Sequence, residues 1–359
     1  MKIAILTLRV DNNYGGNLQR FAMTSFLEDL GHDVTVLYFR SEWNNDNWSK
    51  RLRGVCERML LKMQGISTAP IIYWRHEDTN WESRRKNTFP FFQKYVKHSP
   101  LIWSFDVLKE YVRRENFDAY IVGSDQVFRK RFTERWGLER FFLDFVPSDK
   151  KKIFYSASFG ITEGEYSNED INHLFPLYRR FNAVSVREDS ALLILKRYGW
   201  INPSATLTLD PTLMLSRKIY ERIVNDSCTT QSPGNMFCYV LDINSNIKLK
   251  IKAIAEEKKL TPFYASLTGE NSMSIEQWLR AFMDSEYVIT DSYHGLVFSI
   301  IFNKPFYLLH NCFRGNARFE SLLHLLKIKD GVFNWEEINS IVEREKMKSI
   351  SFIERALEL

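Results

Sequence analysis

The stretch that most constrains how this chain can fold is Tyr287–Phe306, YVITDSYHGLVFSIIFNKPF. Its first four residues are apolar or β-branched, which is typical of a buried parallel strand. A polar turn and an apolar helix follow, and the helix ends before Pro305, because proline disfavours helical geometry at the preceding residue. The pattern predicts a strand, a tight turn, a helix capped by Asp291 or Ser292, and a second strand.

This order of elements places His294 at the carboxyl edge of a sheet, beside the N-terminus of a helix. Ligands of α/β proteins bind at that edge, and helix N-termini stabilise anions. His294 is therefore a candidate functional residue. It could equally be a histidine that only satisfies backbone groups near the helix start, and the spacing favours neither interpretation.

The N-terminal segment has a related pattern. A predicted strand, Lys2–Leu8, is followed by a polar loop that contains Gly15, Gly16 and Asn17, then by a helix, Leu18–Leu30, and a strand, Val34–Phe39. The loop is not G-x-G-x-x-G, so the dinucleotide fingerprint is absent. The two glycines could let backbone amides approach a phosphate or carboxylate; alternatively, the loop only needs residues with positive φ.

Three further predicted strands end in polar residues, at the edge where ligands bind. They are Asp118–Val122, Lys152–Tyr155 and Phe181–Val186. The first leads into Gly123 and then Ser124, Asp125 and Gln126. The third leads into Arg187, which precedes the helix Ala191–Tyr198, where a cation is unfavourable unless it binds an anion.

The second half of the chain repeats the alternation of strands and helices. The predicted strands are Met236–Leu241 and Thr261–Ala265, and the predicted helices are Ile247–Lys259 and Ser274–Asp284. A final amphipathic helix, within Ile341–Leu359, is expected to turn back and pack against the preceding domains. The fold class is therefore α/β. We expect two Rossmann-like domains, residues 1–213 and 214–359, that face each other across a cleft.

Length and composition agree with a soluble two-domain protein. The chain has 359 residues, 45% hydrophobic and 26% charged, and no apolar run of 18 residues, so we expect no membrane span. The first ten residues are too short an apolar segment for a signal peptide. Four scattered cysteines, without metal-ligand spacing, indicate reduced thiols in the cytoplasm and no metal site.

The net charge of +5 is concentrated in one segment, Ser41–Pro100, which holds eleven Lys and Arg residues against six Asp and Glu. The same insertion contains four tryptophans, Trp43, Trp48, Trp74 and Trp81. Such a segment could contact anionic lipid headgroups or a phosphorylated carrier. An ordinary solvated insertion is the commoner case. No nucleic-acid motif accompanies the charge, so we expect no nucleic-acid partner.

Five short motifs occur in an order that resembles the polysaccharide pyruvyl transferase family. They are Asn13–Gln19 (NYGGNLQ), Val122–Phe128 (VGSDQVF), Val184–Glu188 (VSVRE), Leu209–Thr212 (LDPT) and Asp291–Gly295 (DSYHG). Each motif alone is weak, but five in register are specific, and the resemblance covers about residues 1–326. It implies a fold similar to the GT-B glycosyltransferases. It also implies transfer of pyruvate from phosphoenolpyruvate to two sugar hydroxyls as a ketal, without a metal or organic cofactor.

The residues suit this implied reaction. Phosphoenolpyruvate carries a phosphate and a carboxylate, so its site needs cations and exposed amides. Under the resemblance, His294 is the candidate acid or base, because histidine exchanges protons near neutral pH. Arg187, with Gly15, Gly16, Asn17 and Ser292, is expected to bind the donor. Ser124, Asp125 and Gln126 are expected on the acceptor side.

One position departs from the family pattern. Several members have an arginine two residues before the motif histidine, where this chain has Ser292. Lys304, Arg314 or Arg318 could replace that charge; Arg318 could instead be an ordinary residue at a helix start.

The sequence leaves three functions open. The first is pyruvyl transfer to a sugar of a cell-envelope or capsular polysaccharide precursor. Its acceptor could be lipid-linked, which would place the protein at the inner face of the membrane. The second is transfer from a nucleotide sugar on the same fold. The third is a non-catalytic assembly partner. The acceptor sugar and the oligomeric state do not follow from the sequence.

Overall fold

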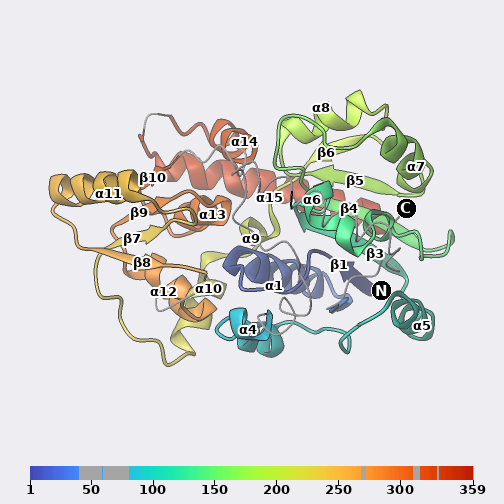
Figure 1. Ribbon diagram of the computed structural model, residues 1–359, viewed down its shortest axis with the longest axis horizontal. Helices are drawn as coiled ribbons and strands as arrows, with labels where there is room; N and C mark the ends of the chain where they lie inside the picture. The colour runs from blue at the N-terminus through green and yellow to red at the C-terminus, as the bar shows by residue number, and fades with distance from the viewer. Residues whose placement is uncertain (40–58, 60–80, 268–271, 310–315, 330, 359) are drawn as a thin grey trace.

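The computed structural model describes residues 1–39, 59, 81–267, 272–309, 316–329 and 331–358 (Figure 1). The described residues form two parallel sheets. The first has the strand order β2-β1-β3-β4-β5-β6, and the second β10-β9-β7-β8. This arrangement confirms the predicted α/β class with two Rossmann-like domains.

The strands of the first sheet are β1 (Lys2–Leu6), β2 (Asp33–Val36), β3 (Ala119–Asp125), β4 (Lys151–Ala157), β5 (Ala183–Val186) and β6 (Ala205–Leu207). Its helices are α1 (Tyr14–Asp29), α4 (Phe89–Tyr95), α5 (Phe105–Glu115), α6 (Lys130–Thr133), η1 (Glu134–Trp136), η2 (Leu138–Phe142), α7 (Asn168–Tyr178) and α8 (Asp189–Arg197). Successive residues of a strand point to opposite faces. Accordingly Ile3 and Ile5 pack with α1, whereas Ala4 and Leu6 join the cluster that holds α5, η2 and α8.

The second sheet is smaller. Its strands are β7 (Met236–Tyr239), β8 (Pro262–Ala265), β9 (Tyr287–Thr290) and β10 (Phe306–Leu308). The remaining helices are α9 (Pro211–Met214), α10 (Arg217–Asn225), α11 (Ser245–Lys258), α12 (Ile275–Asp284), α13 (Tyr293–Ile301), α14 (Ala317–Leu325) and α15 (Trp335–Glu358). Strand, helix and strand therefore follow one another around His294 as the sequence predicts.

Two details at helix starts differ from the prediction. Helix α1 begins at Tyr14, four residues before the predicted start, because the Asn13 side chain accepts a hydrogen bond from Gly16 N (3.1 Å) and caps the helix. Helix α13 has no side-chain cap. The Asp291 carboxylate instead accepts hydrogen bonds from the backbone N–H groups of Leu241 (2.7 Å) and Asp242 (3.2 Å), and so joins the ends of β9 and β7.

The two sheets share one hydrophobic core. Helix α1 contacts α12 and α13 of the second sheet, and the Tyr14 and Trp278 rings stack with their centroids 5.5 Å apart. Helix α15 crosses from the second sheet to the first, drawn in red in Figure 1. There Ser349 Oγ accepts a hydrogen bond from Leu209 N (3.0 Å), and Leu357 O accepts one from Lys151 Nζ. The domains are thus joined by packing as well as by the chain.

Part of the basic insertion is described, and two of its residues are buried and do not face solvent. Trp81 is fully buried and its Nε1 donates to Val10 O (2.8 Å). Arg85 is also buried, with its guanidinium 3.7 Å from the centre of the Trp81 ring and 3.6 Å from that of Phe89. The interfacial role is therefore wrong for these two residues. Trp43, Trp48 and Trp74 lie outside the described residues.

Across the described part of the chain, none of the helices combines the length and apolar character needed to cross a membrane.

The packing of α15 generates a stability prediction. Ile353 is fully buried in the shared core, so Ile353→Ala should lower the free energy of unfolding by about 2–5 kcal/mol. Met347 on the same helix is exposed, and Met347→Ala should change it by no more than about 0.5 kcal/mol. Urea unfolding measures both. Equal effects of the two variants would contradict the packing of α15 on the first sheet.

Candidate active site

The carboxyl ends of four strands bring charged side chains together between the sheets. Asp125 ends β3, Arg187 follows β5, Asp210 follows β6 and His294 follows β9. Arg187 Nη2 lies 2.7 Å from Asp210 Oδ2, and Arg187 Nη1 lies 3.7 Å from Asp125 Oδ1. His294 Nε2 lies 3.7 Å from the same Asp210 oxygen. The site is therefore a connected set of ionisable groups in which Arg187 and His294 each face a carboxylate.

A fifth member of the cluster, Arg318, comes from α14. Its Nη1 lies 3.9 Å from Asp125 Oδ1, and its guanidinium lies 5.3 Å from the centre of the Tyr293 ring. The Arg187 guanidinium lies 4.9 Å from the same ring. Both arginines are buried, and each has at least one nitrogen without a hydrogen-bond partner among the described residues.

Burial and charge determine the protonation states of the cluster. Burial opposes ionisation of Asp125, but Arg187, His294 and Arg318 outweigh it and lower the pKa of that carboxyl. The pKa of Asp210 is lowered in the same way, with burial outweighed by Arg187 and His294. Burial lowers the pKa of His294, and Asp210 offsets this only in part. The resting site therefore has ionised carboxylates and a neutral imidazole.

Gly15 makes room for His294. A Cβ atom at position 15 would lie 2.1 Å from Cγ and Nδ1 of the imidazole, closer than any real contact. The first turn of α1 and the first turn of α13 therefore meet at the histidine, and a side chain at position 15 would displace it.

Two of the backbone amides predicted to bind the donor, those of Gly16 and Asn17, already form hydrogen bonds within the chain. Gly16 N donates to Asn13 Oδ1 (3.1 Å), and Asn17 N donates to Asn13 O (3.1 Å). The buried Asn17 side chain donates to Asp11 O and Asn13 O, both at 2.9 Å. The donor-binding roles predicted for Gly16 and Asn17 are therefore wrong in this structure, because the segment is a capped helix turn and not an open loop.

Two cavities adjoin the cluster. The larger has a volume of about 450 Å³ and lies between the sheets. Among the predicted site residues, those that line it are Asp125, Gln126, Ser292, His294 and Arg318. Tyr239, Leu241, Asp242 and Leu267 line it from the second domain. We call this cavity the interdomain cleft.

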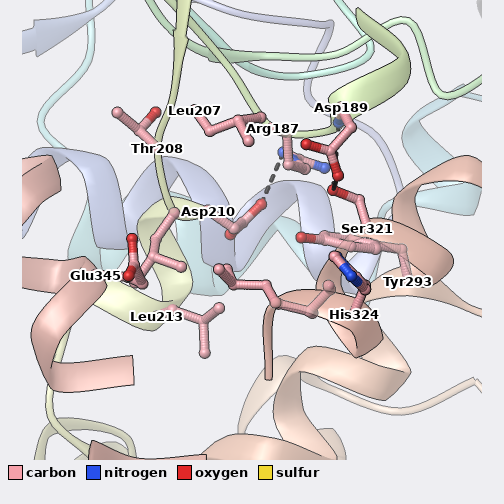
Figure 2. Close-up of a pocket in the computed structure, with 13 residues that line it drawn as sticks. Arg187, Asp189, Leu207, Thr208, Asp210, Leu213, Tyr293, Ser321, His324 and Glu345 are labelled. Atoms are coloured by element: carbon pink, nitrogen blue, oxygen red, sulfur yellow. Dashed lines mark hydrogen bonds and ion pairs between the residues drawn. The ribbon is translucent and has the colours of Figure 1, made fainter. Parts of the chain in front are cut away.

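The smaller cavity has a volume of about 120 Å³ and is shown in Figure 2. Arg187 and Asp210 line it, together with Asp189, Ser321 and Glu345. Tyr293 lines both cavities and so lies where they adjoin. Arg187, predicted to bind the donor, thus faces the smaller cavity and not the interdomain cleft.

The other predicted residues are placed as follows. The buried Ser124 hydroxyl donates to Ser156 O (3.2 Å) and accepts from Arg187, so it supports the cluster and does not line the cleft. Lys304 lies beyond the opposite end of α13, where its Nζ donates to Met283 O (2.9 Å). A donor-binding role for Lys304 is therefore wrong. Arg314 lies outside the described residues.

Asp210 and Tyr293 are site residues that the sequence analysis did not select. Both stood inside recognised motifs, LDPT and DSYHG. An aspartate directly after a strand was the available signal for Asp210. No local signal identified Tyr293, because an aromatic residue at a helix start is usually part of a core. Within the described residues there is no group of three or more His, Cys, Asp or Glu side chains that could hold a metal ion.

The fold and site define a two-domain α/β protein with a cleft, lined by charged residues, between its parallel sheets. The model of one protein family, described as polysaccharide pyruvyl transferase, matches residues 13–312. The chain belongs to this family. A search of curated proteins finds no match to the sequence.

Several solved structures are similar in overall fold, at low sequence identity. UDP-GlcNAc 2-epimerase from Neisseria meningitidis is 10% identical, with 100% of this chain and 93% of that chain covered and a TM-score of 0.47. The Methanocaldococcus jannaschii enzyme of the same name is 14% identical, with 96% and 92% covered and a TM-score of 0.47. An alpha-glucosyltransferase in complex with UDP and DNA is 11% identical, with 100% and 93% covered and a TM-score of 0.42.

The low pKa of His294 leads to a pH-dependence of stability. The unfolded chain binds a proton at this side chain near pH 6.5, whereas the folded chain binds it only at lower pH. Below about pH 6.5 the unfolded state therefore holds more protons, and the free energy of unfolding falls as the pH falls. His294→Gln should make this fall shallower, as measured by urea unfolding between about pH 5 and 8. The wild-type protein, unfolded in the same buffers, is the reference. An unaltered slope in His294→Gln would contradict a buried, neutral imidazole.

Proposed function

We propose that this protein transfers pyruvate from phosphoenolpyruvate to two hydroxyls of a sugar, as a ketal, in the synthesis of a cell-envelope, capsular or extracellular polysaccharide. The observation that carries the proposal is the presence of His294 and Arg318 on one cleft. Each has a buried nitrogen that forms no hydrogen bond within the described residues. Membership of the family supports the same reaction.

Arg318 is proposed as the direct donor-binding cation. Its nearest carboxylate oxygen, Asp125 Oδ1, is 3.9 Å away, which is longer than a hydrogen bond. The guanidinium therefore keeps N–H groups for an anion, and a phosphate or carboxylate suits its planar, forked geometry. Arg318 would then supply the charge that Ser292 does not.

Arg187 is proposed to act indirectly. Its Nη2 binds Asp210 at 2.7 Å, and it also donates to the Ser124 hydroxyl. Arg187 lines the smaller cavity and does not line the interdomain cleft. Arg187 thus keeps the Asp210 carboxylate ionised beside His294. Its positive charge also attracts the anionic donor without direct contact.

The proposed chemistry uses His294 in both of its protonation states. The neutral imidazole accepts the proton of one acceptor hydroxyl, whose oxygen bonds to the central carbon of the enol phosphate, and the imidazolium so formed gives its proton to the methylene carbon, which becomes a methyl group. Inorganic phosphate then leaves with the electron pair of its C–O bond, and cations stabilise its charge. The oxygen of the second hydroxyl bonds to the same carbon, and its proton passes to the departing phosphate. Asp210 stabilises the transient imidazolium.

The reaction as proposed needs no metal or organic cofactor, since phosphoenolpyruvate is consumed as a substrate. The reaction would take place in the cytoplasm, where phosphoenolpyruvate is made. The acceptor can be linked to a nucleotide or to a lipid at the inner face of the membrane. Peripheral contact with that membrane remains part of the proposal.

Donor binding is the first test. Phosphoenolpyruvate should raise the melting temperature of the protein, because a ligand of the folded state stabilises it. Calorimetry should show that Arg318→Gln weakens binding about tenfold or more, through loss of a charge-assisted hydrogen bond. Arg113→Gln, at an exposed arginine on α5, should leave the affinity unchanged. Stabilisation by UDP- or GDP-sugars without any response to phosphoenolpyruvate would instead indicate a nucleotide-sugar transferase.

Proton transfer is the second test. His294→Ala should reduce ketal formation by about 10²–10⁴-fold, the usual contribution of a general acid or base. Turnover is followed by phosphate release and by mass spectrometry of the sugar product, with phosphoenolpyruvate affinity measured in parallel. His173→Ala, at an exposed site, is the matched control. If His294→Ala keeps more than about a tenth of the wild-type turnover, the histidine is not the proton-transfer residue.

A further inference from the structure

The interdomain cleft is larger than the donor requires. Phosphoenolpyruvate has a three-carbon skeleton, and the residues proposed to bind and activate it, Arg318 and His294, occupy one part of a cavity of about 450 Å³. Other parts of the lining belong to the first domain. They include Gln126, Arg129, Arg131 and Phe132, on the segment between β3 and η1. This segment is the natural place to look for acceptor recognition.

Three consecutive cations on this segment differ in their pairing. Arg129 Nε lies 2.5 Å from Glu165 Oε1, and Lys130 Nζ lies 2.6 Å from Asp170 Oδ2. In the described part of the chain, no carboxylate pairs with the Arg131 guanidinium, which is exposed and lines the cleft. Two of the three charges are thus neutralised within the fold, and the third is available to a ligand.

The backbone that carries Arg131 is held in place. Glu165 Oε2 accepts a hydrogen bond from Arg131 N (3.5 Å), and Thr133 Oγ1 donates to Arg129 O (2.9 Å). The Tyr166 hydroxyl donates to Phe128 O (2.7 Å). These bonds fix the segment before a ligand arrives, which reduces the entropy lost on binding.

Phe132 lies beside Arg131 on the same cleft. It is 38% exposed, whereas all other phenylalanines in the described ranges are buried or half-buried. An exposed aromatic ring that lines a cavity presents a flat apolar face to its occupant. The apolar C–H face of a sugar ring can pack on such a surface, while an adjacent arginine binds an oxyanion.

We infer that Arg131 and Phe132 form an acceptor subsite, at which a sugar ring packs on Phe132 and a phosphate attached to that sugar pairs with Arg131. The acceptor is then a sugar linked through a diphosphate, and not a neutral glycoside. The inference rests on the proposed function for the identity of the reacting sugar. A nucleoside diphosphate and a polyprenyl diphosphate present the same group to Arg131.

The test is equilibrium binding to the whole protein, by calorimetry, with UDP, farnesyl diphosphate and a neutral methyl glycoside as probes. At least one diphosphate should bind, the methyl glycoside should bind more weakly, and Arg131→Gln should weaken the diphosphate about tenfold. Phe132→Leu should weaken a UDP-linked or farnesyl-linked sugar, and Phe132→Trp should restore it. Tighter binding of UDP would indicate a nucleotide-linked acceptor, and tighter binding of farnesyl diphosphate a lipid-linked acceptor. Both results support the subsite.

Matched controls separate this inference from the donor proposal. Arg113→Gln removes an exposed arginine elsewhere and should leave diphosphate affinity unchanged. Phosphoenolpyruvate affinity should be the same in Arg131→Gln as in the wild type. If neither diphosphate binds, or if Arg131→Gln binds as tightly as the wild type, the subsite is wrong even when phosphoenolpyruvate binds. If diphosphates bind at Arg131 but phosphoenolpyruvate does not bind, the subsite stands and the donor proposal fails.

Discussion

The carboxylate of Asp210 is the interaction on which the site depends. One oxygen accepts hydrogen bonds from Thr212 N (2.9 Å) and Thr212 Oγ1 (2.5 Å), which fix the group at the start of α9. The other faces Arg187 at 2.7 Å and His294 at 3.7 Å. A buried ion that loses its partner is strongly destabilising, so the carboxylate and Arg187 hold each other in place. The histidine receives its electrostatic environment from this pair.

The buried charges are balanced before any ligand is present. Arg187 and Arg318 face Asp125 and Asp210, and the lowered pKa of His294 keeps the imidazole neutral. An anion placed beside Arg318 would disturb this balance. It would favour the protonated imidazole, because a nearby negative charge stabilises a positive one. An anionic ligand there would therefore make the imidazole a stronger base, which favours its acceptance of a proton.

The parts of the fold that the sequence predicts well are those determined by short-range patterns. The segment around His294 is one, because its strand, turn and helix are each encoded within a few residues. The segment that holds Gly15 and Gly16 differs from its prediction, because the cap formed by Asn13 turns an apparent glycine loop into a helix start. Lys304 follows the histidine by only ten residues, but a helix places it at the other end of α13.

Other features depend on tertiary packing and could not be read locally. Arg318 reaches the site only because α14 packs against α13 and α8. The position of Trp81 also depends on tertiary packing. The charged residues around it in the sequence suggest an exposed surface, but its ring is buried. Whether a residue of a basic segment is buried or exposed depends on long-range contacts. The charged side chains of such a segment can face solvent while its apolar side chains cover a core.

The return of α15 to the first sheet also affects the order in which the protein can fold. Domains generally fold as units during synthesis, the N-terminal one first. Here the first sheet lacks one of its covering helices until the chain has been made as far as Leu357. Until then Tyr155, whose ring centre lies 6.3 Å from that of Phe352, has no such cover. A ribosome-bound chain that ends after β6 therefore has this sheet face covered by α1 but not by α15, so part of its apolar surface stays exposed until synthesis is complete.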